Sequence, residues 1–224
     1  MHQTIRKNKV GRDFVVGDVH GRYDLLRAAM KVADFDKSKD RLFSVGDIVN
    51  RGPESEKCLK LLKKKWFFMV LGNHEEALLE AIKTDTLKRY AREYDDWVKK
   101  IARKDLKMWG KFLSKTPVSM TVKGKGYDFG LCHAEPDGNV WHKTRDRKKS
   151  RLTMLMGRRV WRKKPKTNVK GVDFTIHGHT PMEKPRWVGN RFFIDTGAWY
   201  SEKLTLKAVD EIFKAHKKRE KNNA

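Results

Sequence analysis

The feature that most constrains the fold is a short apolar run that ends at a glycine followed by two metal-binding residue types. Residues 14–16 are Phe-Val-Val, and Gly17, Asp18 and His20 follow directly. A run of this length is typical of a buried strand, and the glycine marks the turn that ends it. Asp18 and His20 are two positions apart, so an extended backbone points both to one side, where they can hold a divalent metal ion. The alternative is a surface turn that contains Asp and His by chance.

The same pattern recurs twice further along the first half of the chain. Residues 42–45 and 66–71 predict two more short strands, each ending at a glycine. Helical apolar spacing lies between the strands, over 23–32 and from Pro53 to Leu62, and again after the third strand. This alternation predicts an α/β fold with parallel strands, in which ligands bind beyond the carboxyl ends of the strands. The residues at those ends are Asp18, His20, Asp47, Asn73 and His74.

The second half of the chain predicts a helical cap and further strands. Residues 84–115 are polar with an interrupted aromatic stripe, which we interpret as a helical cap whose aromatics pack rather than bind ligands. Residues 118–122 and 127–132 predict an antiparallel hairpin that ends at His133. Further strands are expected at 174–176, which runs into His177 and His179, and at 192–194 and 204–209.

The converging side chains predict a site for two metal ions. Asp18, His20 and Asp47 can bind one ion, while Asn73, His133 and His179 can bind a second, with Asp47 shared as the bridging carboxylate. A set of imidazole, carboxylate and amide ligands without a thiolate suits Mn²⁺, Fe or Zn²⁺ in a catalytic site better than a structural zinc. Two such ions, roughly 3.5–4 Å apart, clamp a phosphoryl group and activate water. We interpret the neighbouring His177 as a structural residue.

The chain carries a large excess of positive charge. Its 224 residues include 52 Lys and Arg against 28 Asp and Glu, for a net charge of +24. This balance indicates a polyanionic substrate or partner, although a basic but indifferent surface is the alternative. The segment 143–170 holds thirteen Lys or Arg, one acid and Trp161. It is either a nucleic-acid contact or a solvated basic loop with a packed tryptophan.

Length and cysteine content set the remaining expectations. We expect one catalytic domain over 1–215, followed by a basic, flexible tail over 216–224. Cys58 and Cys132 lie in apolar surroundings, which predicts buried free thiols in a reducing compartment. No signal peptide or apolar run of about 20 residues is present, so the sequence predicts a cytoplasmic protein without a membrane partner.

Five short motifs recur at the strand ends: Gly17-Asp-Val-His-Gly21, Gly46-Asp-Ile-Val-Asn-Arg-Gly52, Gly72-Asn-His-Glu75, His133-Ala134 and Gly178-His-Thr180. Together they resemble the signature set of the calcineurin-like metallophosphoesterases, and the resemblance includes Phe193-Ile-Asp-Thr-Gly-Ala198. Within that superfamily the chain is most similar to the serine/threonine phosphoprotein phosphatases of the lambda phage and bacterial branch. The resemblance implies a sandwich of central β-sheets flanked by helices, in a bacterial or phage-infected cell.

The resemblance also implies a role for each motif residue. A metal-bound hydroxide would attack phosphorus directly, and His74 would protonate the leaving oxygen. Arg51 would grip the phosphate, together with a second arginine for which Arg158 is the candidate. One metal ion would be held by Asp18, His20 and Asp47, and the other by Asp47, Asn73, His133 and His179.

Two positions depart from the phosphatase pattern. Asn50 stands where the protein phosphatases usually carry an acidic partner of the catalytic histidine, and Leu71 stands where the lambda-type pattern has an arginine. Both departures are familiar from diadenosine tetraphosphate hydrolases, a sister branch. Our leading hypothesis is therefore a serine/threonine protein phosphatase, with a hydrolase of dinucleoside polyphosphates or RNA 5′ ends as the alternative. A nucleic-acid-binding module with a vestigial site is a third hypothesis, which the intact ligand set opposes.

Overall fold

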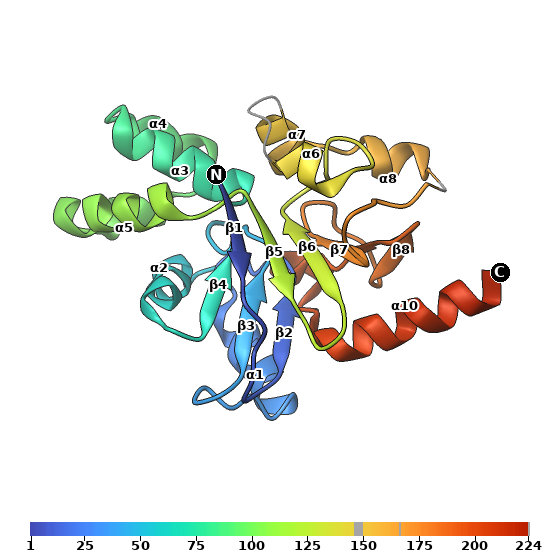
Figure 1. The fold of residues 1–224 in the computed structure, drawn as a ribbon. Helices are drawn as coiled ribbons and strands as arrows, with labels where there is room; N and C mark the ends of the chain where they lie inside the picture. The colour runs from blue at the N-terminus through green and yellow to red at the C-terminus, as the bar shows by residue number, and fades with distance from the viewer. Residues whose placement is uncertain (146–149, 166, 224) are drawn as a thin grey trace.

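Two β-sheets pack against each other in the computed structural model, which describes residues 1–145, 150–165 and 167–223 (Figure 1). The smaller sheet has the strand order β10-β2-β3-β4. Its first three strands in the chain are parallel, as the sequence predicts, and β10 pairs antiparallel with β2. These strands are β2 (Asp13–Val16), β3 (Arg41–Ser44), β4 (Phe67–Met69) and β10 (Leu206–Ala208).

The larger sheet has six strands in the order β1-β5-β6-β7-β9-β8. The predicted hairpin is present as the antiparallel pair β5–β6. The sequence prediction missed β1 and β8, because both are short and neither contains an apolar run. The six strands are β1 (His2–Ile5), β5 (Ser119–Lys123), β6 (Asp128–Cys132), β7 (Phe174–His177), β8 (Arg186–Val188) and β9 (Arg191–Phe193).

Alternating side chains of the smaller sheet pack into two separate hydrophobic cores. Val15 and Phe43 point into the core between the sheets, where the rings of Phe43 and Phe129 meet edge to face at 5.9 Å. Phe14 and Leu42, one residue earlier in each strand, point to the other face and pack under the helices. Burial on both faces explains why these strands read as continuous apolar runs in the sequence.

Helices cover the outer face of the smaller sheet. Two groups of helices lie at one end of the molecule (Figure 1). The predicted cap is present, and Tyr90 and Trp109 are buried in it. The helix expected to open at Pro53 begins two residues later and is short. The helices are α1 (Tyr23–Val32), α2 (Ser55–Leu59), η1 (Lys60–Lys63), α3 (Asn73–Lys83), α4 (Leu87–Glu93), η2 (Asp96–Lys100), α5 (Arg103–Lys115), α6 (Trp141–Arg145), α7 (Ser150–Met156), α8 (Arg159–Lys163) and α9 (Ala198–Ser201).

The carboxyl-terminal segment differs from the expected flexible tail. Helix α10 (Val209–Asn223) runs through it, and His216 is buried within the part expected to be frayed. The helix is anchored by its first half, where Ile212 is buried and the ring of Phe213 stacks on Tyr127 at 4.4 Å. The charged composition after residue 216 hid this helix, because the apolar residues that dock it precede that position.

Two further expectations concern thiols and membranes. Cys58 and Cys132 are both buried and free, as the sequence predicts. Across the part of the chain that the structure describes, we find no helix of the length and apolarity needed to cross a bilayer.

Candidate metal centre

The predicted ligands come together where the strands of both sheets end. The loops after β2 and β3 are joined by hydrogen bonds from the Val19 and His20 amides to the Asp47 carbonyl, at 3.1 and 2.8 Å. The loops after β6 and β7 are joined in the same way, since Gly178 N–H donates to the His133 carbonyl at 2.7 Å. These four loops, together with the start of α3 (Asn73–Lys83) after β4, assemble the centre.

A buried carboxylate fixes the loop that carries Asp47. Glu75, in the first turn of α3, accepts backbone N–H bonds from Asp47, Ile48, Val49 and Gly72 at 2.8 to 3.2 Å. Its side chain is fully buried, and burial, followed by the charge of Asp47, raises its pKa to about 7. Four convergent N–H donors satisfy this buried carboxylate and determine the path of the loop.

Backbone strain concentrates at the same place. Five non-glycine residues of the centre have positive φ, although this region disfavours side chains with a Cβ. Such conformations persist where the surrounding contacts enforce them, and they gather at functional sites. The five are His20 (φ 44°), Asp47 (φ 51°), Asn50 (φ 71°), Arg51 (φ 73°) and His179 (φ 65°).

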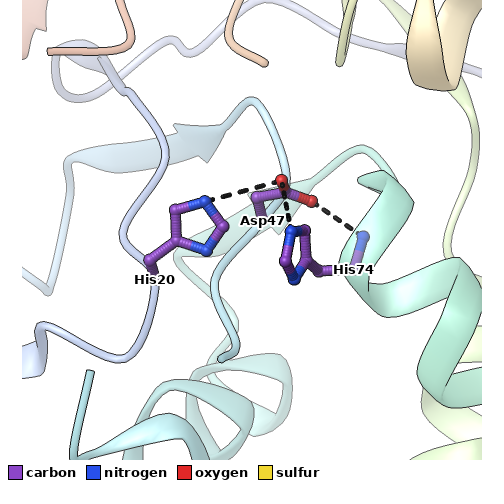
Figure 2. Close-up of side chains that lie close together, drawn as sticks. All are labelled: His20, Asp47 and His74. Carbon is purple, nitrogen blue, oxygen red and sulfur yellow. Dashed lines mark hydrogen bonds and ion pairs between the residues drawn. The ribbon is translucent and has the colours of Figure 1, made fainter. Parts of the chain in front are cut away.

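Asp47 belongs to two groups of side chains with metal-binding geometry. One group is His20, Asp47 and His74 (Figure 2), and the other is Asp47, His133 and His179. Within each group the ligand atoms lie within 4.8 Å of one another. The Asp47 Oδ2 atom lies 3.7 Å from His20 Nε2 and 3.3 Å from His133 Nε2. This position between the groups is the one that a bridging carboxylate requires.

Hydrogen bonds to backbone carbonyls set the tautomers of two of the histidines. His20 Nδ1 lies 3.0 Å from the Val49 carbonyl, and His133 Nδ1 lies 2.8 Å from the Val45 carbonyl. A carbonyl can only accept, so Nδ1 carries the proton in both rings. Each Nε2 then presents a lone pair to the centre, which is the arrangement of a metal-binding imidazole.

His74 has the opposite tautomer, and Asn50 is the reason. Tyr90 Oη and Trp97 Nε1 lie 2.8 and 2.7 Å from Asn50 Oδ1. An indole N–H can only donate, so the atom that it contacts is the amide oxygen. The amide nitrogen therefore faces His74 Nδ1, at 2.8 Å, and donates to it. The proton of the neutral His74 ring lies on Nε2, so this nitrogen can donate to a substrate but offers no lone pair to a metal ion.

Asp18 is a candidate ligand that lies outside the two groups, with a carboxylate oxygen free to bind a cation. Its Oδ2 accepts the His179 N–H at 3.0 Å, while its buried Oδ1 has no hydrogen-bond partner among the described residues. Burial, and then the charges of Asp195 and Asp47, raise the pKa of Asp18 well above its ordinary value. Three buried carboxylates crowded together with an unpartnered oxygen match the donor set of a divalent cation.

Two glycines leave the space that the carboxylates occupy. A Cβ at Gly178 would lie 1.9 Å from Asp18 Oδ1, and a Cβ at Gly72 would lie 2.2 Å from Asp47 Oδ1. Both glycines belong to the sequence motifs, and close approach of the ligand oxygens explains them there. The residues present therefore fit a pair of divalent ions.

Asn73 and Asp195 complete the surroundings of the centre. Asn73 Oδ1 lies 3.0 Å from both His133 Nε2 and His179 Nδ1, in the second group. Asp195 was missing from the residues predicted as ligands. It is buried after β9, accepts the Gly197 N–H at 2.8 Å and lies close enough to Asp18 to raise its pKa. Its position at a strand end, before Thr196 and Gly197, is the signal that could have found it.

The two candidate phosphate-binding arginines approach different groups. Arg51 Nη1 lies 3.1 Å from His20 Nε2, and Arg51 Nη2 lies 3.5 Å from His74 Nε2. Arg158 is the N-cap residue of α8, whose first amides are held by Glu135. The pKa of His179 is lowered to about 3, mainly by burial and then by nearby charges that include Arg158. One arginine therefore lies near each group of ligands.

Two other sequence expectations concern residues outside the centre. His177 Nε2 lies 2.7 Å from Thr175 Oγ1, and its Nδ1 lies 3.1 Å from the Cys132 carbonyl, so this buried ring faces the protein interior. That contact set agrees with a structural role. Leu71 is buried in the core under the helices, so the departure at this position changes packing rather than the ligand set.

Comparisons with known proteins agree with this geometry. The sequence profile of the family described as "Calcineurin-like phosphoesterase" matches residues 14–215. Serine/threonine-protein phosphatase 1 of Salmonella typhimurium is 28% identical over 93% of this chain and 97% of its own length. The symmetrical bis(5'-nucleosyl)-tetraphosphatase of Hamiltonella defensa is 45% identical over 69 residues, which are 30% of this chain and 25% of that enzyme.

Solved structures show the same fold. A putative diadenosine tetraphosphatase has a TM-score of 0.62 at 21% identity and covers 92% of this chain and 93% of its own. A serine/threonine phosphatase from Saccharomyces cerevisiae has a TM-score of 0.61 at 16% identity, covering 90% of this chain and 73% of its own.

Replacing the shared carboxylate tests the two-metal geometry. We expect Asp47→Asn to lower p-nitrophenyl phosphate turnover on the order of a hundredfold or more, because even outer partners of metal ligands contribute 10- to 100-fold. The fold should persist, since an amide oxygen can still accept the His74 N–H. Mn²⁺ stoichiometry and turnover are measured on the purified variant. The control is Asp85→Asn at an exposed ion pair. Normal turnover with two bound ions would contradict the shared role of Asp47.

Proposed function

Because the chain belongs to the calcineurin-like phosphoesterase family, we propose that it hydrolyses phosphoserine and phosphothreonine in proteins, with broad specificity. Two bacterial relatives that match it over nearly their full length are named serine/threonine-protein phosphatases. The observation that carries the proposal is the pair of ligand groups that share Asp47. Mn²⁺ is the proposed ion, with Fe and Zn²⁺ as alternatives, because the ligands are oxygen and nitrogen atoms without a thiolate.

The side chains of the centre have different proposed roles around a bound phosphate. Two divalent ions, when bound, supply positive charge to the phosphoryl oxygens and activate water. Asp18, His20, Asp47, Asn73, His133 and His179 would hold them. Arg51 presents a planar fork of donors suited to two phosphate oxygens, and Arg158 is proposed as its counterpart beside His179. His74 Nε2–H, which points into the centre, would donate its proton to the leaving oxygen.

A panel of substrates tests this function directly. The enzyme is loaded with Mn²⁺ and assayed on phosphoserine and phosphothreonine peptides, diadenosine tetraphosphate, triphosphorylated RNA and p-nitrophenyl phosphate. Phosphopeptide turnover with a kcat/KM above that of the nucleotides supports the proposal. Turnover of nucleotides alone would replace the leading proposal with the second one.

The second candidate function is hydrolysis of phosphoanhydrides in nucleotides, which the Asn50–His74 hydrogen bond favours. An acidic residue in place of Asn50 would accept a hydrogen bond from Nδ1–H and stabilise a doubly protonated ring. The amide instead donates to Nδ1, so His74 donates from a neutral ring, which is a weaker acid. A weaker acid is less of a handicap when the leaving group is already stable, as with a nucleotide phosphate or p-nitrophenolate.

Substituting Asn50→Asp reverses this hydrogen bond. We expect phosphoserine peptide turnover to rise several-fold relative to p-nitrophenyl phosphate turnover, because the serine alkoxide depends most on proton donation. Tyr90 and Trp97 can still donate to a carboxylate, so the local structure should be retained. The measurement is the ratio of kcat values for the two substrates, in which differences in metal loading largely cancel.

Asn168→Asp, at an exposed position, adds the same charge away from the centre and serves as the control. A ratio that stays constant in the Asn50 variant, or shifts toward p-nitrophenyl phosphate, would show that His74 is not the acid assisted at this position.

Nucleic-acid contact through the basic segment 143–170 is part of the proposal for partners. Residues 146–149 and 166 of this segment lie outside the described structure. Arg162, Lys163 and Lys164 are exposed on and after α8, while the ring of Trp161 is half-buried against Phe193 at 5.8 Å. The lysines and arginines are thus available to phosphates, and the tryptophan is largely engaged in packing. We place the enzyme in the cytoplasm, which suits its two free thiols.

Salt dependence distinguishes a nucleic-acid contact from an indifferent basic surface. If the segment binds the phosphate backbone, the affinity for single-stranded RNA or DNA should fall steeply between 50 and 200 mM salt, on the order of a thousandfold for six contacts. Fluorescence anisotropy with a labelled oligonucleotide measures it. Binding that does not depend on salt, or no binding at low salt, would remove nucleic acid from the partners.

A further inference from the structure

The exposed aromatic side chains of the molecule gather around the metal centre. All aromatic residues lie in the part of the chain that the structure describes, and three of them are classed as exposed. They are Tyr94 (39% exposed), Trp199 (43%) and Tyr200 (54%). Tyr94 meets His74 edge to face at 5.3 Å, and Trp199 covers the guanidinium of Arg51 at 5.1 Å from Cζ to the ring centre. Their shared location is not explained by packing, because packing would bury them.

Trp199 and Tyr200 form an aromatic platform on α9. Their rings meet edge to face at 5.2 Å. Tyr200 lies directly over Gly197, where a Cβ would come within 2.3 Å of its ring and where φ is +69°. The Gly197 N–H is in turn held by Asp195, next to the metal ligands. The platform is therefore anchored to the centre through its own backbone.

Arg51 separates this platform from the candidate metal ligands. One side of its guanidinium lies against His20 Nε2 at 3.1 Å, and a ring face of Trp199 lies 5.1 Å from Cζ. An exposed indole therefore lies beside the position at which a phosphate would engage the Arg51 fork. Stacking of a planar ring on an aromatic side chain next to a cation is favourable, and it is strongest when the ring is desolvated.

We propose that Trp199 is a specificity-determining residue that stacks on the base of a nucleotide substrate whose phosphates are held at Arg51. The inference rests on the proposed phosphoesterase function and concerns its second class of substrate. Charge supports this occupant, since the chain carries +24 and a nucleoside polyphosphate is an anion. The spacing supports it as well, because a ring on Trp199 must reach past Arg51, and the ribose of a nucleotide supplies that spacer.

A phosphotyrosine ring fits the platform less well. Its ring is bonded directly to the phosphate ester oxygen, so it would lie where the leaving group departs, beside His74 and Tyr94 rather than beyond Arg51. A phosphoserine peptide offers no planar group at a fixed distance from its phosphate. The nucleobase is thus the occupant that the positions of Arg51 and Trp199 favour.

Matched substrates with and without a base test the proposal. The Mn²⁺-loaded enzyme is assayed on ATP and on inorganic tripolyphosphate, which share a phosphate chain. We expect Trp199→Ala to raise the KM for ATP roughly tenfold, as base stacking on one aromatic side chain predicts, and to change the KM for tripolyphosphate less than threefold. Trp199→Phe should restore most of the ATP affinity. Trp161→Ala removes another indole that contacts a cation, Lys164, and should leave the ATP preference unchanged.

Binding separates failure of the platform from failure of the proposed function. Calorimetry with AMP and with inorganic phosphate, both with Mn²⁺, needs no turnover. Tighter binding of AMP than of phosphate, lost in Trp199→Ala, supports the platform even if neither ATP nor any phosphoester is hydrolysed. Equal binding of the two ligands by the unmodified protein would overturn the proposal. An equal loss for both in Trp199→Ala would also overturn it, because Trp199 would then only position Arg51.

Discussion

The metal centre depends on one buried carboxylate that accepts four backbone N–H bonds. Glu75 receives the amides of Asp47, Ile48, Val49 and Gly72, and it thereby joins the loop after β3 to the start of α3. A neutral glutamine at this position would direct its own NH₂ group, which can only donate, at backbone N–H groups that also can only donate. The positive φ of Asp47, and with it the direction of the shared carboxylate, persists because these bonds enforce it. The geometry of both ligand groups follows from this anchor.

Hydrogen-bond direction then distinguishes the candidate ligands from the candidate acid within one cluster of histidines. His20 and His133 donate to carbonyls and turn lone pairs toward the centre, while His74 accepts from Asn50 and turns a proton toward it. Distance alone would place His74 among the ligands, since it lies within the first ligand group. Its tautomer suits His74 to proton donation instead, and Asp18 is the ligand that we propose in its place. The cap contributes to chemistry in this way, because Tyr90 and Trp97 fix the orientation of the Asn50 amide.

The sequence predicted the parallel strands and the convergence of the ligand residues, because both follow from local patterns. Apolar runs that end in Gly-Asp or Gly-Asn indicate where a strand ends and which side chains follow it. The sequence prediction missed β1 and the helical part of the tail. Both segments are polar, and they pack through contacts with residues that are distant in the sequence. Asp195 follows a strand end, so a local signal for it was present although it was not predicted as a ligand. The aromatic platform has no such signal, because its proximity to Arg51 is created by the return of α9 to the centre.

The most direct test of this assignment is a crystal structure of the Mn²⁺-loaded protein with phosphate, in which anomalous scattering locates the ions. We expect two ions roughly 3.5–4 Å apart with the Asp47 carboxylate between them. We also expect Asp18 in the coordination sphere of one ion, and His74 still bonded to Asn50 with Nε2 directed at the phosphate. A single ion, or an ion coordinated by His74 Nε2 at about 2 Å, would contradict the assignment of ligands and acid made from the hydrogen-bond directions.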